Sequence, residues 1–394
     1  MRVIRMALAA AVAGATAVAG PAAGSMAGSA ARAYPARADH LAAEAVPATC
    51  TPADVLSQMS LPQRVGQLFM TGVDTDSPTA AQLQMIRRRH LGGVVLIGHS
   101  FRGVAAMRAT TRTIQDQARS DGVGLWVSAD QEGGEVQVLN GPGFSRIPTA
   151  LTQGSWAPST LQARARTWGT QLAAAGVNLN LAPVLDTVPA WLGTGNGPIG
   201  RYYREYGYRP AVVTSHGLAV RRGMRAANVQ TTAKHFPGLG RVRNNTDTSF
   251  DVVDDVTTRH DAYLRPFAAA IAHGIPVVMV SSARYTRIDA KHLAMFSPVV
   301  LRGMLRHDLG FNGVIVSDSL SAAAVGHVPV QWRAVRLLRA GGDVALTADS
   351  AEVPAMVRAV LQRARQVPDF RARVDAAALT VLRAKAREAL LPCQ

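Results

Sequence analysis

Residues 314–318 read VIVSD, three β-branched apolar residues followed directly by Ser317 and Asp318. The run is too short for a helix and does not alternate between apolar and polar side chains, which is typical of a parallel strand buried on both faces. A helix-like stretch comes before it at 298–306, and another follows at 329–340. The segment is therefore a strand-and-helix unit with polar groups at the carboxyl end of the strand.

Seven further apolar runs of this kind occur along the chain, separated by longer amphipathic stretches. The runs lie at 65–70, 93–97, 125–130, 177–186, 230–235, 277–282 and 343–347. The helix-like stretches lie at 80–89, 103–119, 161–175, 210–225, 260–273, 298–306 and 329–340, with a final pair at 352–365 and 370–390. Eight such units in about 300 residues favour an α/β fold of the (β/α)8 barrel type, in one domain, over an open sheet.

Ionisable side chains collect at the carboxyl ends of these runs, where barrels of this kind carry their chemistry. Asp130 ends the third run, Asp186 the fourth, Lys234 and His235 the fifth, and Asp318 the seventh. We therefore expect these groups to meet at one rim of the barrel.

The segment KHFPGLG at 234–240 resembles the KHFPGHG motif of family 3 glycoside hydrolases, in the branch of the bacterial β-N-acetylhexosaminidases (β-N-acetylglucosaminidases). Four other segments resemble this family in the same order: DQEGG at 130–134, NLAPVLD at 180–186, REYG at 204–207 and LGFNGVIVSDSL at 309–320. The resemblance implies a retaining hydrolase that works through a covalent glycosyl–enzyme intermediate, with two carboxyl groups about 5–5.5 Å apart.

The resemblance also implies roles for individual residues. Asp318 matches the nucleophile, which must be ionised and held by a rigid strand end. The residues that match the sugar-binding positions are Asp130, Arg204, Lys234 and His235. Arg201 competes with Arg204, because the spacing of this segment differs from the family pattern. Asp186 is expected to hold loop backbone groups.

The acid/base loop departs from the family pattern. The family continues as KHFPGHG-D-x-x-x-D-S-H, whereas this chain reads KHFPGLG-R-V-R-N-N-T-D, so that Asn245 takes the Asp position and Asp247 the His position. One interpretation makes Asp247 the acid/base, with a pKa raised by burial or by a nearby carboxylate. The other is a loop without chemistry, in a slow hydrolase or a glycan-binding protein. Three other side chains are alternative candidates for the missing proton donor: Glu132, Glu135 and His99.

The N-terminus has the composition of an export signal, since Arg2 and Arg5 precede an apolar stretch at 6–20 and small residues follow it. We expect a signal peptide at about 1–33, a disordered linker at 34–49 and the barrel domain at 50–394. A closed barrel brings its first and last elements together, so we expect a disulfide between Cys50 and Cys393, with two free thiols as the alternative.

The formal net charge of +16 comes mostly from arginine. The arginines are spread along helix-like stretches and no nucleic-acid motif occurs, so we expect no nucleic-acid partner. No metal-ligand spacing and no phosphate-binding loop occur, so neither a metal nor another cofactor is expected. A basic mature protein suits an anionic cell wall.

The sequence therefore predicts a secreted monomer, extracytoplasmic and associated with the cell wall, without stable membrane insertion once the signal is removed. Its expected substrate is a terminal β-linked N-acetylglucosamine of peptidoglycan-type glycans. The alternative, if the protein is an enzyme, is a β-glucosidase or a β-xylosidase with the same fold.

Overall fold

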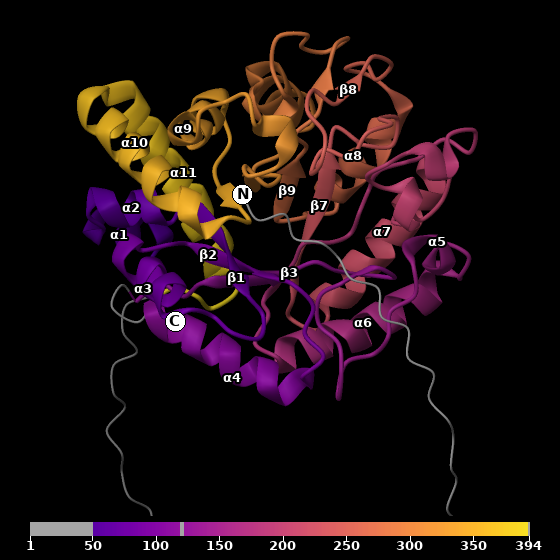
Figure 1. Ribbon diagram of the computed structural model, residues 1–394, viewed down its shortest axis with the longest axis horizontal. Helices are drawn as coiled ribbons and strands as arrows, with labels where there is room; N and C mark the ends of the chain where they lie inside the picture. The colour runs from indigo at the N-terminus through magenta and orange to yellow at the C-terminus, as the bar shows by residue number, and fades with distance from the viewer. Residues whose placement is uncertain (1–49, 119–121, 393–394) are drawn as a thin grey trace, which may run out of the picture. The chain divides into compact units, whose positions relative to one another are not determined.

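The computed structural model describes residues 50–118 and 122–392. Within them, eight strands pair in parallel into one sheet, in the order β11 (Val314–Ser317), β9 (Val277–Val280), β7 (Gln230–Phe236), β6 (Leu179–Asn180), β3 (Trp126–Ala129), β2 (Gly93–Ile97), β1 (Phe69–Asp74) and β12 (Ala345–Thr347). Val316 of β11 forms a parallel bridge with Val344, the residue directly before β12. The bridge joins the ends of the sheet, which confirms the (β/α)8 barrel. Figure 1 shows the strands in the middle of this barrel with the helices around them.

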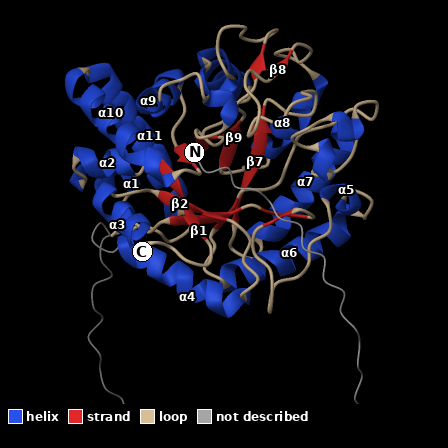
Figure 2. Ribbon diagram, viewed as in Figure 1, coloured by secondary structure: helices blue, strands red, loops and turns tan. Residues whose placement is uncertain are grey.

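Helices connect the strands and cover the outside of the barrel (Figure 2). They are α3 (Ala80–Arg89), α4 (Gly103–Gln115), α6 (Pro158–Ala174), α7 (Pro210–Arg225), α8 (Arg265–Ala272), a π-helix at Val299–Asp308, α9 (Val330–Ala340), α10 (Val353–Gln366) and α11 (Pro368–Ala386). Shorter helices are α1 (Pro52–Gln58), α2 (Leu61–Gly66) and α5 (Ala150–Gln153). Proline occupies the first turn of α6, α7, α10 and α11, where its missing N–H leaves no unmade hydrogen bond.

The first strand begins later than the predicted run 65–70, and that prediction was wrong in its start. Ser60 and Gln63 form a capping box, in which each side chain accepts a hydrogen bond from the backbone N–H of the other residue. This cap starts helix α2, which takes the first two residues of the apolar run. Strand β1 therefore starts at Phe69.

The predicted strand at 177–186 is also shorter in the structure, where only Leu179 and Asn180 belong to β6. Pro183 has no N–H to give to a ladder, so regular pairing ends before it. The chain returns for a single bridge between Val184 and Lys234. The stretch that follows carries Asp186 to the rim of the barrel.

A buried aspartate ties the sheet together where β11 begins. Asp343 is 1% exposed and accepts a hydrogen bond from the Ile315 N–H at 2.9 Å. Its two oxygens also pair with Arg306 and Arg373, each at 2.6 Å. The two guanidinium groups compensate the buried charge, which would otherwise oppose folding.

Two small sheets lie in the connections after the strands. Strand β4 (Gln131–Gly133) pairs with β5 (Val136–Gln137) in antiparallel fashion, and β8 (Val253–Asp254) pairs with β10 (Arg284–Tyr285) in parallel. The first sheet carries most of the DQEGG segment.

The predicted signal peptide and linker lie outside the described residues, and so does Cys393. Cys50 is half-buried and packs against a small apolar cluster that contains Val55 and Leu391. Leu391 stands two positions before Cys393 in the sequence, and the disulfide stays a prediction. Among the described ranges, no helix has both the length and the apolar character that a bilayer crossing requires.

Candidate active site

Four charged side chains form a cluster at the carboxyl ends of β3 and β7. Lys234, the fifth residue of β7, contacts the carboxylates of both Asp130 and Glu132, the latter at 2.6 Å from its Nζ. Arg204 donates two hydrogen bonds to Glu132, from Nε at 2.8 Å and from Nη2 at 2.7 Å. Glu132 thus joins a lysine and an arginine that lie 30 residues apart in the chain.

The cluster is charged although it is almost wholly buried. The Lys234 side chain is 2% exposed and that of Glu132 is 4% exposed. Burial alone would raise the pKa of Glu132, but Arg204 and Lys234 outweigh it and lower that pKa to about 2. Burial would likewise lower the pKa of Lys234, and Asp130 and Glu132 raise it instead. Asp130 keeps 32% of its side chain exposed, so its carboxylate remains open to a ligand.

His235 follows Lys234 in the chain, and Asp186 holds its imidazole ring and its backbone. Its Nδ1 is 2.7 Å from Asp186 Oδ2. The other oxygen of Asp186 accepts hydrogen bonds from the backbone N–H groups of His235 and Leu239. Asp186 therefore holds loop backbone groups, as its position at a strand end predicts, and it also fixes the orientation of the imidazole ring.

Asp318 follows β11 directly, and hydrogen bonds hold both its backbone and its side chain. Its N–H donates to the Val280 carbonyl at 2.8 Å, and its Oδ1 accepts the Ser319 N–H at 2.8 Å. The residue is half-buried. A carboxylate at the end of a paired strand cannot move far, which suits a group that must approach a fixed reacting atom.

The loop that follows β7 is tied to the barrel at its beginning. The Asn196 side-chain amide donates to the carbonyls of Leu239 and Val242 at 2.7 and 2.6 Å. Arg241 forms a two-point ion pair with Asp261, and its guanidinium lies 3.8 Å from the ring centre of Tyr263. These contacts hold the first half of the loop in one position.

The second half of the same loop rests on the segment that follows Asp318. Asn245 Oδ1 accepts the Asp247 N–H at 2.9 Å, which makes a tight local turn. The carbonyls of Thr246 and Asp247 accept hydrogen bonds from Ala324 and Ala323. These bonds join the loop of Asp247 to the segment that begins with Asp318.

The environment of Asp247 raises the pKa of its carboxyl group above the usual value of 3.8. The surrounding protein atoms are the largest cause, and the negative charge of Asp318 is the second, while Arg204 and His235 act in the opposite direction. Asp247 as a residue is nevertheless exposed. A carboxyl group with a raised pKa therefore lies within electrostatic reach of a second carboxylate.

The structure thus places Asp130, Arg204, Lys234, His235, Asp247 and Asp318 at one rim. Arg201, the competitor of Arg204, is exposed and makes no contact with Glu132 among the described hydrogen bonds. Of the substitute proton donors, Glu132 is held ionised by its two partners, and Glu135 is exposed. His99 is exposed and its Nδ1 is bonded to the Gln137 carbonyl.

Sequence reasoning missed the residues that support this site. Glu132 was considered only as a proton donor, whereas it is the centre of the charge cluster. The role of Glu132 could have been inferred from the charges, because two cations, Lys234 and Arg204, cannot both be buried with Asp130 as their single counter-charge. Asn196 and Arg241 had no comparable signal, since their partners are distant in the chain.

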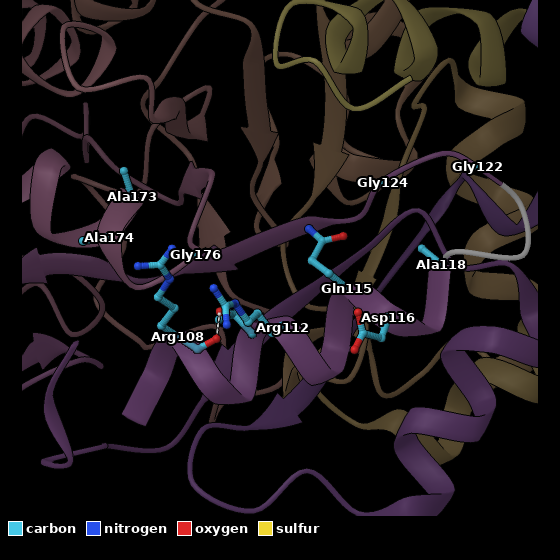
Figure 3. Close-up of a pocket in the computed structure, with 11 residues that line it drawn as sticks. Arg108, Arg112, Gln115, Asp116, Ala118, Gly122, Gly124, Ala173, Ala174 and Gly176 are labelled. Atoms are coloured by element: carbon cyan, nitrogen blue, oxygen red, sulfur yellow. Dashed lines mark hydrogen bonds between the residues drawn. The ribbon is translucent and has the colours of Figure 1, made fainter. Parts of the chain in front are cut away.

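A cavity of about 670 Å³ lies elsewhere, beside the helix α4 and the end of α6 (Figure 3). Four residues of its wall show its place in the fold. Arg108 belongs to α4 and Asp116 follows it directly, while Gly124 precedes strand β3 and Gly176 precedes strand β6. It contains none of the rim residues, so we place the active site at the carboxyl ends of the strands. No cluster of three or more His, Cys, Asp or Glu side chains in the described residues is arranged to hold a metal ion.

Known proteins with similar sequences and structures agree with the barrel fold and with the family that the motifs resemble. Residues 60–384 match the family described as the glycosyl hydrolase family 3 N-terminal domain. A β-hexosaminidase of Stenotrophomonas maltophilia is 33% identical over 310 residues, which are 75% of this chain and 88% of that protein.

Two solved structures are similar throughout the barrel. The β-N-acetylhexosaminidase of Beutenbergia cavernae is 48% identical, with a TM-score of 0.82 over 84% of this chain and 99% of that one. A family 3 β-N-acetylglucosaminidase of a Paenibacillus species is 30% identical, with a TM-score of 0.77 over 84% of this chain and 63% of that one.

Proposed function

Because this chain belongs to glycosyl hydrolase family 3 and is a glycoside hydrolase, we propose that it is a retaining exo-β-N-acetylhexosaminidase. Its substrate would be terminal β-linked N-acetylglucosamine. The observation that carries the proposal is the pair formed by Asp318 and Asp247, in which one carboxylate is fixed by a strand end and the other carboxyl has a raised pKa. One carboxylate that attacks the anomeric carbon and a second carboxyl group that supplies the proton are what this chemistry requires at one bond. The sugar specificity rests on the β-hexosaminidases to which the chain is similar.

In the first step, the Asp318 carboxylate attacks the anomeric carbon. The bond from this carbon to the leaving oxygen breaks, and Asp247 gives that oxygen its proton. In the second step, water attacks the anomeric carbon, Asp247 takes a proton from the water, and the bond to Asp318 breaks. Both carboxyl groups then return to their starting states, and the configuration of the sugar is retained.

The charge cluster would bind and orient the sugar. The exposed part of the Asp130 carboxylate accepts hydrogen bonds from hydroxyl groups, and Lys234 and Arg204 place positive charge beside it. Since Glu132 holds both cations, their positions are set before substrate arrives, which reduces the entropy lost on binding. His235, fixed by Asp186, offers its other ring nitrogen to the ligand.

Hydrolysis of nitrophenyl β-glycosides by the protein without residues 1–33 tests the activity. We expect turnover of the N-acetylglucosaminide in excess of the glucoside and xyloside, and loss of this turnover in Asp318→Asn. A folded protein that hydrolyses none of the three faster than Asp318→Asn would refute the proposal. Preference for the glucoside or xyloside would keep the mechanism and change the sugar.

The role of Asp247 needs a separate experiment. An acid/base variant should retain the first step only with a leaving group that needs no proton, and an added nucleophile should then speed the second step. We expect Asp247→Asn to hydrolyse the dinitrophenyl glycoside better than the nitrophenyl glycoside and to be accelerated by azide, with a β-glycosyl azide as product. Asp255→Asn is the matched control, because Asp255 is an exposed carboxylate of the same connection. An Asp247→Asn enzyme with unchanged turnover would exclude this residue as the acid/base.

We further propose that the protein is secreted and acts on peptidoglycan-type glycans at the cell wall. The support is the basic and apolar N-terminal segment, together with the net positive charge. N-terminal sequencing of the protein recovered from culture medium, and release of N-acetylglucosamine from peptidoglycan fragments, test these two points. Recovery of the uncleaved chain only from cells would contradict the first.

A further inference from the structure

The exposed apolar side chains are distributed unevenly over the barrel. The large apolar residues that are exposed in the described part of the chain are Phe101, Trp191, Tyr203, Tyr208, Phe250, Val256, Val299 and Trp332. Each lies between the carboxyl end of a barrel strand and the first turn of the helix that follows it. All therefore belong to the face of the barrel that carries Asp318 and Asp247, and none belongs to the opposite face.

Three of these side chains are aromatic and more than two-thirds exposed: Phe101 at 71%, Trp191 at 74% and Phe250 at 72%. Aromatic side chains of this size are usually covered, because burying them yields a large part of the hydrophobic stabilisation. Their concentration at one face indicates a surface that is covered when a ligand binds.

Two of the three flank the loop that carries Asp247. The Trp191 ring lies 5.9 Å from the guanidinium carbon of Arg243, four positions before Asp247. Phe250 stands three positions after Asp247, and its ring lies so near Gly326 that a Cβ on this glycine would come 2.8 Å from Phe250 Cε1. Gly326 belongs to the segment that follows Asp318 and binds the loop.

We propose that Trp191 and Phe250 bind the leaving group of the substrate, and that this leaving group is a further saccharide unit. The inference rests on the proposed function. Asp247 must reach the leaving oxygen to protonate it, so the leaving group has to lie against the loop of Asp247. The C–H bonds on one face of a pyranose ring carry slight positive charge, which suits the negative face of an aromatic ring. Trp191 and Phe250 offer such faces beside the loop that carries the proton donor.

The consequence is a preference for glycan chains over small leaving groups. Contacts with the leaving group are made in the transition state of the first step, so they raise kcat/KM only for substrates that have such a group. Each variant is compared with the wild type on the same substrate, so that the difference in leaving-group acidity between the two substrates does not enter the comparison.

The test compares chitotetraose with β-N-acetylglucosaminyl azide, whose leaving group has no ring and needs no proton. For Trp191→Ala and for Phe250→Ala we expect kcat/KM on chitotetraose to fall by about tenfold, as the loss of an aromatic contact of roughly 1.4 kcal/mol implies, mainly through KM. On the azide we expect less than about a twofold change. Phe101→Ala is the matched control, since its ring is equally exposed on the same face but belongs to the connection after β2.

An unchanged ratio of the two kcat/KM values in both variants would overturn the inference, and so would an equal loss in Phe101→Ala. Because the three side chains are exposed, their removal leaves no cavity, and thermal unfolding should be unchanged in all three variants. If the wild-type protein hydrolysed neither substrate, the proposed function itself would fail. Wild-type activity on both substrates with an unchanged ratio would refute only the leaving-group site.

Discussion

Replacing Glu132 with glutamine would test whether the charge cluster of the active site also stabilises the fold. The variant keeps the shape of the side chain but removes the negative charge that Lys234 and Arg204 both contact. Lys234 would then remain 2% exposed with Asp130 alone as its carboxylate partner. A buried cation that loses one of two counter-charges should weaken both the fold and the sugar site.

The magnitude can be estimated in two ways. A pKa lowered from 4.5 to about 2 corresponds to about 3 kcal/mol of folding free energy at neutral pH. Removal of one member of a buried ion pair costs about 3–5 kcal/mol in other proteins. We therefore expect the free energy of unfolding of Glu132→Gln to be lower by about 3 kcal/mol at pH 7.

The effect should depend on pH in one direction. The pKa of Glu132 is lowered by folding, so its contribution is complete above its ordinary pKa of 4.5 and is lost as the pH falls through about 2. Urea unfolding, followed by tryptophan fluorescence, should therefore give a difference between wild type and variant that shrinks as the pH falls below 4.5.

A second variant separates this effect from the general loss of an ion pair. Asp308→Asn breaks the pair between Asp308 and Arg259, whose side chain is 41% exposed, and should change the free energy of unfolding far less. The reasoning would be refuted if Glu132→Gln lost no more stability than Asp308→Asn. A loss that stayed undiminished from pH 7 to about pH 3 would refute the electrostatic cause.

Three further predictions concern the proton donor, the closure of the barrel and the Asp247 loop. If Asp247 is the acid, its raised pKa keeps it protonated to higher pH, so kcat/KM should fall only as the pH rises through a value above 3.8, and this limb of the pH profile should be absent in Asp247→Asn. Asp343→Asn should lower the free energy of unfolding by about 3 kcal/mol in urea while kcat per folded molecule is unchanged, because its two guanidinium partners lie away from the rim; a loss of kcat with full stability would contradict this. Gly240→Ala should lower kcat at least about tenfold, since a Cβ there would lie 1.8 Å from the Thr187 carbonyl oxygen and must displace the loop; wild-type kinetics would show that the loop position does not matter.

Much of the fold could be predicted because its strands are buried on both faces. A continuous apolar run such as 93–97 indicates a strand that is buried on both faces, and the structure has β2 at the same residues. Errors arose where a local interaction outweighed the hydrophobic pattern. The capping box at Ser60 turned part of one run into helix, and Pro183 ended another strand early. Neither effect changes the number or order of strands.

The candidate site was predictable to the extent that its groups stand at strand ends. Asp130, Lys234, His235 and Asp318 each follow or end a buried run, and parallel strands bring such positions to one rim. The position of Asp247 was not predictable in this way, because it lies 11 residues after β7 in a loop without regular structure.

The amino-acid sequence by itself determined the class of fold, the rim that carries the chemistry and the family, because each of these depends on residues that are close together in the chain. Only the tertiary structure decided that Glu132 joins Lys234 to Arg204, and that Arg241 and Asn196 hold the loop of Asp247 beside Asp318. These contacts join segments that are far apart in sequence, and their strength comes from burial, which removes water from between the charges. Burial is a property of the folded barrel and cannot be read from any one segment.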